Sequence, residues 1–220
     1  VIEVAGDVDR FDVGDRVFGM VDHGAYAEEV VFAQDGPVAL IPEGLSFDEA
    51  AATPYGALTA LEFLRDLGNL AAGERVLILG ASGGVGRYAI EIARHLGAHV
   101  TAVCSGRHEA LARRLGAHEV IDYREANILE SSETFDVIFD IADATSFAAC
   151  KHLLDEGGRY LTLTLSLQVI WQMVRTKRAS RSAIFSVSLP DREQVEELAG
   201  MLAAGVVHPH IIHRFPFERI

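Results

Sequence analysis

Cysteine is scarce in this chain, and the residues that usually build a metal centre are scattered. Only Cys104 and Cys150 occur among 220 residues, and their separation matches no metal-ligand motif. We therefore expect two small buried thiols in a reduced compartment, of which the cytoplasm is the default. His208, His210 and His213 share one segment, but no adjacent carboxylate is present to orient them as metal ligands. We expect exposed or half-buried histidines and no metal.

Basic residues and long apolar runs are also in short supply. The 19 lysines and arginines compare with 32 aspartates and glutamates, which gives a net charge of −13. Such a charge repels a phosphate backbone and argues against a nucleic-acid partner. The longest weakly charged stretch, residues 160–174, is interrupted by Thr, Ser and Gln. It falls short of a bilayer span, so we expect no membrane partner.

A glycine-rich segment lies between an apolar run and an amphipathic helix pattern. The run Val76–Leu79 suits a buried strand and leads into Gly80-Ala-Ser-Gly-Gly-Val-Gly86, after which apolar residues recur at helical spacing as far as Leu96. Glycine lets the turn close and lets backbone N–H groups approach a diphosphate, while the helix N-terminus adds partial positive charge. This combination predicts a dinucleotide-binding turn.

The residues after the next strand indicate which dinucleotide is bound. NAD-specific folds place an acid about 20 residues beyond the glycines, where it accepts hydrogen bonds from the ribose 2′-OH. Here the strand His99–Cys104 is followed by Ser105, Gly106 and Arg107, with no acid before Glu109. A hydroxyl beside a guanidinium suits a 2′-phosphate, which a carboxylate would repel. The pattern favours NADPH over NADH; the alternative is that Arg107 is a solvated residue at the start of the next helix.

Strand and helix patterns alternate between about Leu45 and Val206. We expect strands at residues 76–80, 99–104, 119–123, 135–141, 158–164 and 183–188. We expect helices between them, near residues 84–96, 107–116, 145–155, 166–178 and 191–204. Strict alternation predicts an α/β fold with a doubly wound parallel sheet, covered by helices on both faces. A ligand should then bind at the carboxyl ends of the strands, where the strand order reverses.

Residues 1–41 follow a different, β-rich pattern. Alternating apolar residues predict short strands at residues 1–5, 16–20 and 26–32. A capping box at Ser46-Phe-Asp-Glu49 predicts a long helix towards Leu67 that bridges two modules. After Gly205 the chain leaves the sheet pattern and is expected to return to the first module. The predicted domains are therefore residues 1–44, residues 45–207, and a returning segment at residues 208–220.

Eight motifs occur in the order in which one known family carries them. They are Val13-Gly-Asp-Arg-Val-Phe-Gly19, Gly24-Ala-Tyr-Ala-Glu28, Ile41-Pro-Glu-Gly-Leu45, Ala50-Ala51, Gly56-Ala-Leu-Thr-Ala60, Gly80-Ala-Ser-Gly-Gly-Val-Gly86, Leu115-Gly-Ala-His-Glu-Val-Ile-Asp-Tyr123 and Phe135-Asp-Val-Ile-Phe-Asp140. Jointly they resemble the zinc-free quinone oxidoreductase branch of the medium-chain dehydrogenase/reductase superfamily. The resemblance implies a Rossmann-type NADP-binding domain and a partial GroES-like β domain, whose N-terminal part and C-terminal end we expect to be missing.

The resemblance implies an NADPH-dependent oxidoreductase that transfers a hydride to a quinone, enone or related carbonyl, and a homodimer when the protein is complete. Zinc-dependent relatives carry a four-cysteine lobe after the turn at Gly14, whereas this chain has no cysteine there. Tyr55 stands where those relatives have a zinc-ligand cysteine, so we expect no zinc. The alternative is a non-catalytic NADPH-binding sensor or scaffold, because a fold does not determine function.

The resemblance also assigns cofactor and pocket roles to individual residues. The backbone expected to hold the diphosphate is that of Ser82, Gly83, Gly84 and Val85. Ser105 and Arg107 are expected to meet the 2′-phosphate. Tyr123 matches a position whose phenol borders that phosphate and the adenine; alternatively it packs on the sheet edge as a strand-end aromatic. Thr59 matches a position beside the nicotinamide ring. Tyr55, one helical turn earlier, is a candidate substrate-pocket residue or fills space between modules.

Two residues depart from the family pattern, and no residue is identified as catalytic. Asp143 stands where members have a glycine near the nicotinamide ribose, so its carboxylate either accepts a ribose hydroxyl or repels the cofactor. Arg87 occupies a position in the phosphate helix where small residues are commoner, and either contacts the diphosphate or reaches solvent.

Overall fold

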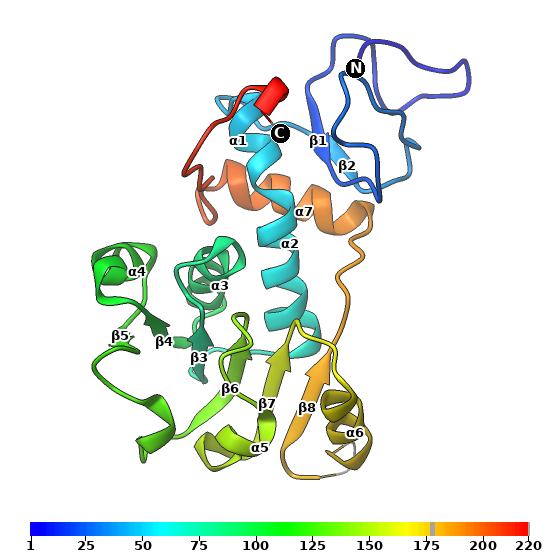
Figure 1. Ribbon diagram of the computed structural model, residues 1–220. Coiled ribbons are helices and arrows are strands. Elements are labelled where there is room, and N and C mark those ends of the chain that lie inside the picture. The colour runs from blue at the N-terminus through cyan, green and yellow to red at the C-terminus, as the bar shows by residue number, and fades with distance from the viewer. Residues whose placement is uncertain (177–178, 220) are drawn as a thin grey trace. The chain divides into compact units, whose positions relative to one another are not determined.

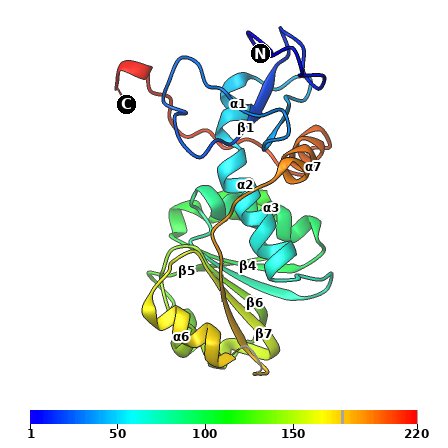
Figure 2. The ribbon, with the colours of Figure 1, turned by 90° about the vertical axis from the view of Figure 1, so that its right-hand side faces the viewer.

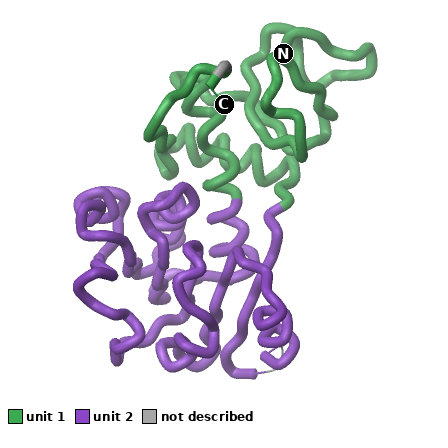
Figure 3. Tube along the Cα trace, in the orientation of Figure 1, with its two compact units in different colours: residues 1–58, 189–220 green, residues 59–188 purple. Residues whose placement is uncertain are grey.

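The computed structural model describes residues 1–176 and 179–219 and divides into two compact units. One unit, here called the terminal unit, comprises residues 1–58 and 189–220; the other, the sheet unit, comprises residues 59–188 (Figure 3). These boundaries differ from the predicted ones at residues 44 and 207. The assignment of residues 1–44 to a GroES-like domain stays a prediction.

The sheet unit contains all six strands expected from the alternating pattern. They are β3 (Arg75–Leu79), β4 (His99–Cys104), β5 (Glu119–Asp122), β6 (Phe135–Asp140), β7 (Leu154–Thr162) and β8 (Ser182–Phe185). Their order is β5-β4-β3-β6-β7-β8, and every neighbouring pair is parallel (Figure 1). The predicted doubly wound parallel sheet is confirmed, and its order reverses between β3 and β6.

Helices connect these strands and cover the sheet. They are α3 (Gly84–His95), α4 (Glu109–Leu115), α5 (Phe147–Cys150) and α6 (Leu167–Thr176). The helix α3 packs against β3, β4 and α4, whereas α6 packs against β8. Figure 2 shows α3 and α6 on opposite sides of the sheet. The last two residues of the helix expected at 166–178 lie outside the described residues.

The helix expected at residues 145–155 is much shorter than predicted. A single turn, α5, passes into a 3-10 turn at Lys151–Leu153, because Leu154 already joins the sheet opposite Phe135. The register then shifts before Arg159 pairs with Val137, and Gly157 has a φ of +85° within this irregular stretch. Such a φ favours glycine, which periodicity alone does not reveal.

Apolar side chains from both faces of the sheet are buried. The Phe63 and Phe139 rings stack with centroids 5.3 Å apart, and Phe147 meets Tyr160 edge-on at 6.2 Å. Cys104 and Cys150 are both buried free thiols, as expected. Burial of these apolar residues supplies the main stabilising free energy of the sheet unit.

The long helix expected after Ser46 forms as three consecutive segments. They are α1 (Phe47–Ala52), α2 (Pro54–Leu61) and a π-helical segment, η1 (Glu62–Leu67). The capping box of Ser46 and Glu49 is present. The first break falls at Pro54, which has no N–H to donate and disfavours a helical residue before it. The division between the two units passes through α2.

The terminal unit contains one short antiparallel pair and one long helix. The strand β1 (Val17–Gly19) pairs with β2 (Val38–Leu40), and α7 (Arg192–Ala203) packs against β2. Arg10 on the β side contacts Glu196 of α7. This packing explains why α7 belongs to the terminal unit, although its sequence continues the alternating pattern of the sheet.

Two strands predicted in this unit do not form. Residues 1–5 make isolated backbone contacts, in which the Val1 ammonium donates to the Asp15 carbonyl at 2.6 Å and Gly14 N–H donates to the Val1 carbonyl at 2.9 Å. Residues 26–32 are mostly exposed, and Val31 is 96% exposed. A strand needs a neighbouring strand to pair its backbone groups, and the described residues offer none to either segment. Residues 208–219 lie in the same unit as residues 1–58, and their assignment to a GroES-like domain stays a prediction.

Candidate functional site

The predicted phosphate-binding residues lie at the carboxyl edge of the sheet. Leu79, the last residue of β3, pairs with Val103 on β4 and with Asp140 on β6. Cys104, the last residue of β4, pairs with Asp122 on β5. The segments that follow these strands therefore start side by side at the point where the strand order reverses.

The glycine turn after β3 has a shape that depends on two of its glycines. Gly80 has a φ of +85°, a left-handed conformation that L side chains rarely adopt. A methyl group on Gly86 would overlap the carbonyl oxygen of Gly80 and the backbone of Ala81. Gly86 thus lets the first turn of α3 approach the end of β3 closely.

The same turn leaves open space where a ligand can approach. A methyl group on Gly84 would meet nothing within 4 Å, and Gly83 and Gly84 are exposed. Gly83 is the N-cap of α3 and supplies no side-chain cap. The first N–H groups of a helix lack intrahelical partners and carry partial positive charge, so this end of α3 attracts an anion. The assignment of residues 82–85 to a diphosphate stays a prediction, with which this open helix start is compatible.

The loop after β4 is held by a carboxylate from the neighbouring strand. Gly106 N–H donates to Asp122 Oδ2 at 2.8 Å, and Arg124 N–H donates to Asp122 Oδ1 at 2.9 Å. A side chain at position 106 would overlap the Asp122 carboxylate. Asp122 therefore shapes the loop that carries Ser105 and Arg107.

Three side chains able to carry positive charge gather beside the turn. Arg107 Nε donates to His108 Nε2 at 3.1 Å, and Arg87 Nε donates to the Ser82 carbonyl at 2.9 Å. Partial burial, and then the charges of Arg107 and Arg87, lower the pKa of His108. We call Arg87, Arg107 and His108 the cationic cluster.

For Arg87, the structure bears on the two alternatives that the sequence left open. Arg87 is half-buried and anchored to the phosphate turn, so it does not simply extend into solvent. His108 was missed by sequence analysis, and its position directly after Arg107 was the available signal. Ser105 lies in the same loop and is buried.

Tyr123 follows β5 and lies one strand away from the loop of Ser105. Its N–H donates to the Cys104 carbonyl at 3.3 Å, and the residue is 59% exposed. The Arg124 guanidinium lies 5.9 Å from the ring centroid. An exposed ring does not suit the alternative in which Tyr123 packs on the sheet edge, and its role beside the adenine stays a prediction.

The segment after β6 is organised by a buried carboxylate. Asp140 accepts hydrogen bonds from Ala144 N–H at 3.0 Å, from Thr145 N–H at 2.9 Å and from the Tyr160 hydroxyl at 2.9 Å. Burial, together with the charge of Asp140, raises the pKa of Tyr160 and keeps the phenol protonated.

Within that segment, Asp143 has a φ of +52° and is exposed. The left-handed conformation explains why glycine suits this position in the family, and Asp is among the residues that tolerate it best. The two alternatives for its carboxylate remain open.

The two residues predicted on α2 fall in different units. Thr59 belongs to the sheet unit and is 6% exposed, whereas Tyr55 belongs to the terminal unit and is 73% exposed. Their roles beside the nicotinamide ring and in the substrate pocket therefore stay predictions.

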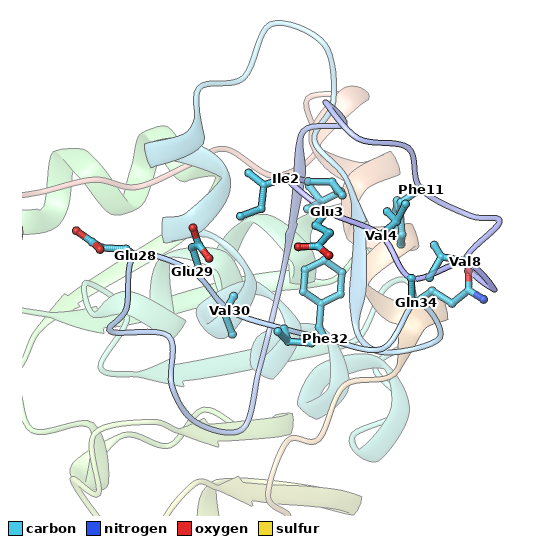
Figure 4. Close-up of a pocket in the computed structure, with 14 residues that line it drawn as sticks. Ile2, Glu3, Val4, Val8, Phe11, Glu28, Glu29, Val30, Phe32 and Gln34 are labelled. Carbon is cyan, nitrogen blue, oxygen red and sulfur yellow. The ribbon is translucent and has the colours of Figure 1, made fainter.

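The terminal unit has an apolar cavity of its own. Its volume is about 400 Å³, and it lies between residues 1–8 and 28–34, with Phe11 and Val17 completing the wall (Figure 4). The lining is mainly aliphatic, with Glu3, Glu28, Glu29 and Gln34 at its polar positions. It lies between the two segments predicted as strands and holds no basic side chain to bind a phosphate.

The described residues contain neither a side-chain cluster suited to a metal ion nor a helix suited to a bilayer. No three or more His, Cys, Asp or Glu side chains gather there in a way that could hold a metal ion. The expected absence of zinc stays a prediction. No helix in residues 1–176 and 179–219 is long and apolar enough to cross a bilayer.

Known proteins resemble this chain in both sequence and fold. A family model described as zinc-binding dehydrogenase matches residues 115–220. A Bos taurus protein named mitochondrial NAD(P)H oxidoreductase RTN4IP1 is 36% identical, with 100% of this chain and 63% of that protein covered. Homo sapiens quinone oxidoreductase is 32% identical, with 100% of this chain and 71% of that protein covered. The solved structure of the quinone oxidoreductase from Coxiella burnetii matches with a TM-score of 0.82 at 28% identity, covering 93% of this chain and 65% of that one.

The chain thus spans 63% of the length of the bovine relative. Together with the parallel sheet order and the glycine turn, these similarities establish the family. The chain belongs to the quinone oxidoreductase-like branch of the medium-chain dehydrogenase/reductase superfamily.

Proposed function

We propose that this chain is the cofactor-binding part of an NADPH-dependent oxidoreductase that reduces a quinone, enone or related carbonyl. The observation that carries the proposal is the cationic cluster beside an open glycine turn. The turn and the N-terminus of α3 suit a diphosphate, and Arg87 and Arg107 suit a further phosphate. The acid at the end of the neighbouring strand β5, Asp122, accepts hydrogen bonds from two backbone N–H groups.

The chemistry of the proposed reaction comes from the nicotinamide, which supplies a hydride when the cofactor is bound. The residues of this chain bind and orient the cofactor, and such orientation can lower a barrier by ~7–11 kcal/mol. The names of the relatives support a nicotinamide cofactor and a quinone acceptor. Thr59 is proposed beside the nicotinamide, Tyr55 in the substrate pocket, and Tyr123 beside the adenine.

Cofactor choice is tested by binding rather than by turnover. Arg107→Ala should weaken NADPH binding by about 1.5–3 kcal/mol, because one charge-assisted contact to the 2′-phosphate is lost. NADH binding should stay unchanged, since NADH has no such phosphate. Calorimetric titration with both cofactors measures this. Arg113→Ala is the matched control, because Arg113 pairs with Glu109 on the surface of α4. Equal affinity for both cofactors in the unmodified protein would contradict the proposal.

Zinc independence and acceptor class need separate measurements. The absence of cysteine after Gly14 and the presence of Tyr55 support a zinc-free enzyme, although the matching family model carries a zinc-binding name. Metal analysis of the purified protein should find no stoichiometric zinc. A panel of quinones and enones should stimulate NADPH oxidation. NADPH binding without turnover in the complete protein would favour the alternative, a sensor or scaffold.

Assembly and location are further parts of the proposal. We propose a homodimer for the complete protein, which sedimentation measures directly. A cytoplasmic location is proposed as well, although the bovine relative is named as mitochondrial. Fractionation of the native protein distinguishes the two compartments.

A further inference from the structure

We propose that His108 is a third ligand of the cofactor's 2′-phosphate and that NADPH binding takes up a proton on this residue. The inference rests on the proposed NADPH function and adds a residue and a pH dependence to the same site. It starts from the hydrogen bond in which Arg107 Nε donates to His108 Nε2 at 3.1 Å. A guanidinium only donates, so Nε2 must accept, and the imidazole in this geometry carries no proton on Nε2.

The charges around His108 keep it neutral in the unliganded protein. Arg107 on its own loop and Arg87 on α3 both disfavour the imidazolium, and together with partial burial they lower the pKa of His108. The nearby acids have other partners. Glu109 on α4 pairs with Arg113 at 2.9 Å, and Asp122 on β5 accepts from two backbone N–H groups.

Binding of a 2′-phosphate favours the protonated form of His108 instead. The phosphate brings a charge of about −1.5 to −2 and three strong acceptor oxygens into a site with two guanidiniums. Arg107 then donates to the phosphate in place of His108, and the imidazole binds a proton from solvent so that Nε2 can donate as well. Up to one proton is therefore taken up from solvent for each NADPH bound, and no covalent bond of the cofactor is broken.

The consequence is an affinity for NADPH that rises as the pH falls. Between the lowered pKa of the free site and the raised pKa of the bound site, each unit of pH should change the dissociation constant by up to about tenfold. The phosphate's own second ionisation, near pH 6, opposes this trend at lower pH. The informative range is therefore about pH 6.5–8.5. NADH lacks the phosphate and should bind equally well throughout this range.

The experiment titrates NADPH and NADH into the protein by cofactor fluorescence and by calorimetry in buffers of different ionisation enthalpy. The unmodified protein should take up a substantial fraction of a proton with NADPH and none with NADH. His108→Gln should bind NADPH several-fold more weakly and with no pH dependence from this source. His108→Lys keeps a charge at every pH in the range and should bind tightly without proton uptake. His152→Gln is the control, because His152 contacts the Leu129 carbonyl far along the chain from the cluster.

The outcomes separate this inference from the proposed function. Preference for NADPH that depends on Arg107, with the same proton uptake in His108→Gln as in the unmodified protein, would overturn the role of His108 and leave the cofactor assignment intact. Equal affinity for NADPH and NADH would overturn both. Circular dichroism of each variant shows whether a loss of binding reflects a loss of folding.

Discussion

Gly84 and Gly86 lie two residues apart in the phosphate turn but are required for different reasons. Gly86 is needed for packing, because a methyl group there would overlap the Gly80 carbonyl and the backbone of Ala81. Gly84 has open space around it, so a methyl group there is compatible with the fold. Neither residue has a positive φ, so the difference arises from space alone.

Gly86→Ala should therefore destabilise the protein by about 1–3 kcal/mol, the usual cost of overpacking a tight contact. Gly84→Ala should leave the free energy of unfolding nearly unchanged but weaken NADPH binding, because the methyl group occupies the space that a diphosphate needs. Urea denaturation and cofactor fluorescence measure the two effects. If Gly84→Ala bound NADPH normally, the diphosphate could not lie against this glycine.

At this scale the sequence predicted features that depend on local spacing. The glycine turn after β3 and the loop that carries Ser105 and Arg107 after β4 follow directly from the sequence, whereas their roles in cofactor binding stay predictions. The anchoring of Arg87 and the contact of Arg107 with His108 did not follow, since rotamers and hydrogen bonds are chosen by the folded surroundings. Asp122 was also missed, because its partner Gly106 lies 16 positions away in the chain.

Two sets of side-chain hydrogen bonds connect elements of the sheet unit in addition to the backbone hydrogen bonds between strands. From within β7, the Arg159 side chain donates to both carboxylate oxygens of Glu74 at 2.9 and 2.7 Å and to the Gly68 carbonyl at 2.7 Å. At the start of β4, Val100 N–H donates to His118 Nδ1 at 3.0 Å. Each connects segments that are distant in sequence, so neither was visible as a periodic pattern.

Arg159→Met should lower the free energy of unfolding by about 1.5–3 kcal/mol, the typical contribution of hydrogen bonds to charged groups. The guanidinium satisfies a carboxylate and backbone carbonyls at once, and a thioether replaces none of these bonds. Arg113→Met is the matched control, since its exposed pair with Glu109 contributes only about 0.3–0.5 kcal/mol. Equal losses in the two variants, measured by urea denaturation, would show that Arg159 does not connect these segments.

His118 should make the stability of the protein depend on pH. Desolvation by neighbouring groups, followed by the charges of His99 and Arg94, lowers the pKa of His118, and its Nδ1 can accept from Val100 only when unprotonated. The folded state therefore favours the neutral ring. The stabilisation is fully present above the ordinary histidine pKa of about 6.5 and is lost as the pH falls through the lower folded pKa.

His118→Asn keeps a hydrogen-bond acceptor but cannot be protonated. Its free energy of unfolding, measured by urea denaturation between pH 5 and 8, should fall less steeply towards acid than that of the unmodified protein. If the unfolding free energies of the two proteins changed with pH in parallel, His118 would not contribute to the pH dependence. His95→Asn, at the end of α3, controls for removal of any one histidine.

At the scale of the whole molecule, the sequence predicts a module boundary at residue 44, whereas the two compact units divide after residue 58. Periodicity identified the parallel strands most directly where a strand is buried on both faces, as in β3, whose residues Val76–Leu79 are all apolar and buried. It also suggested strands at residues 1–5 and 26–32, where alternation is present but pairing is not. The placement of α7 was equally invisible, since it depends on packing against β2 rather than on any property of the helix itself.

The two units should differ in how strongly they protect their amide hydrogens from exchange. The sheet unit has six mutually paired strands, and opening its central strands requires loss of its buried core. Among its described residues, the terminal unit has a single pair of three-residue strands, and residues 20–36 lie outside any helix or strand. Amides of β3, β4 and β6 should therefore exchange slowest, and those of residues 1–13 and 20–35 fastest.

Because α7 belongs to the terminal unit, its protection should fall together with that of β1 and β2 in mild denaturant, before the sheet opens. Hydrogen exchange followed by mass spectrometry resolves these segments. Protection of α7 that persists until β8 opens would instead place this helix with the parallel sheet, as the sequence pattern first suggested.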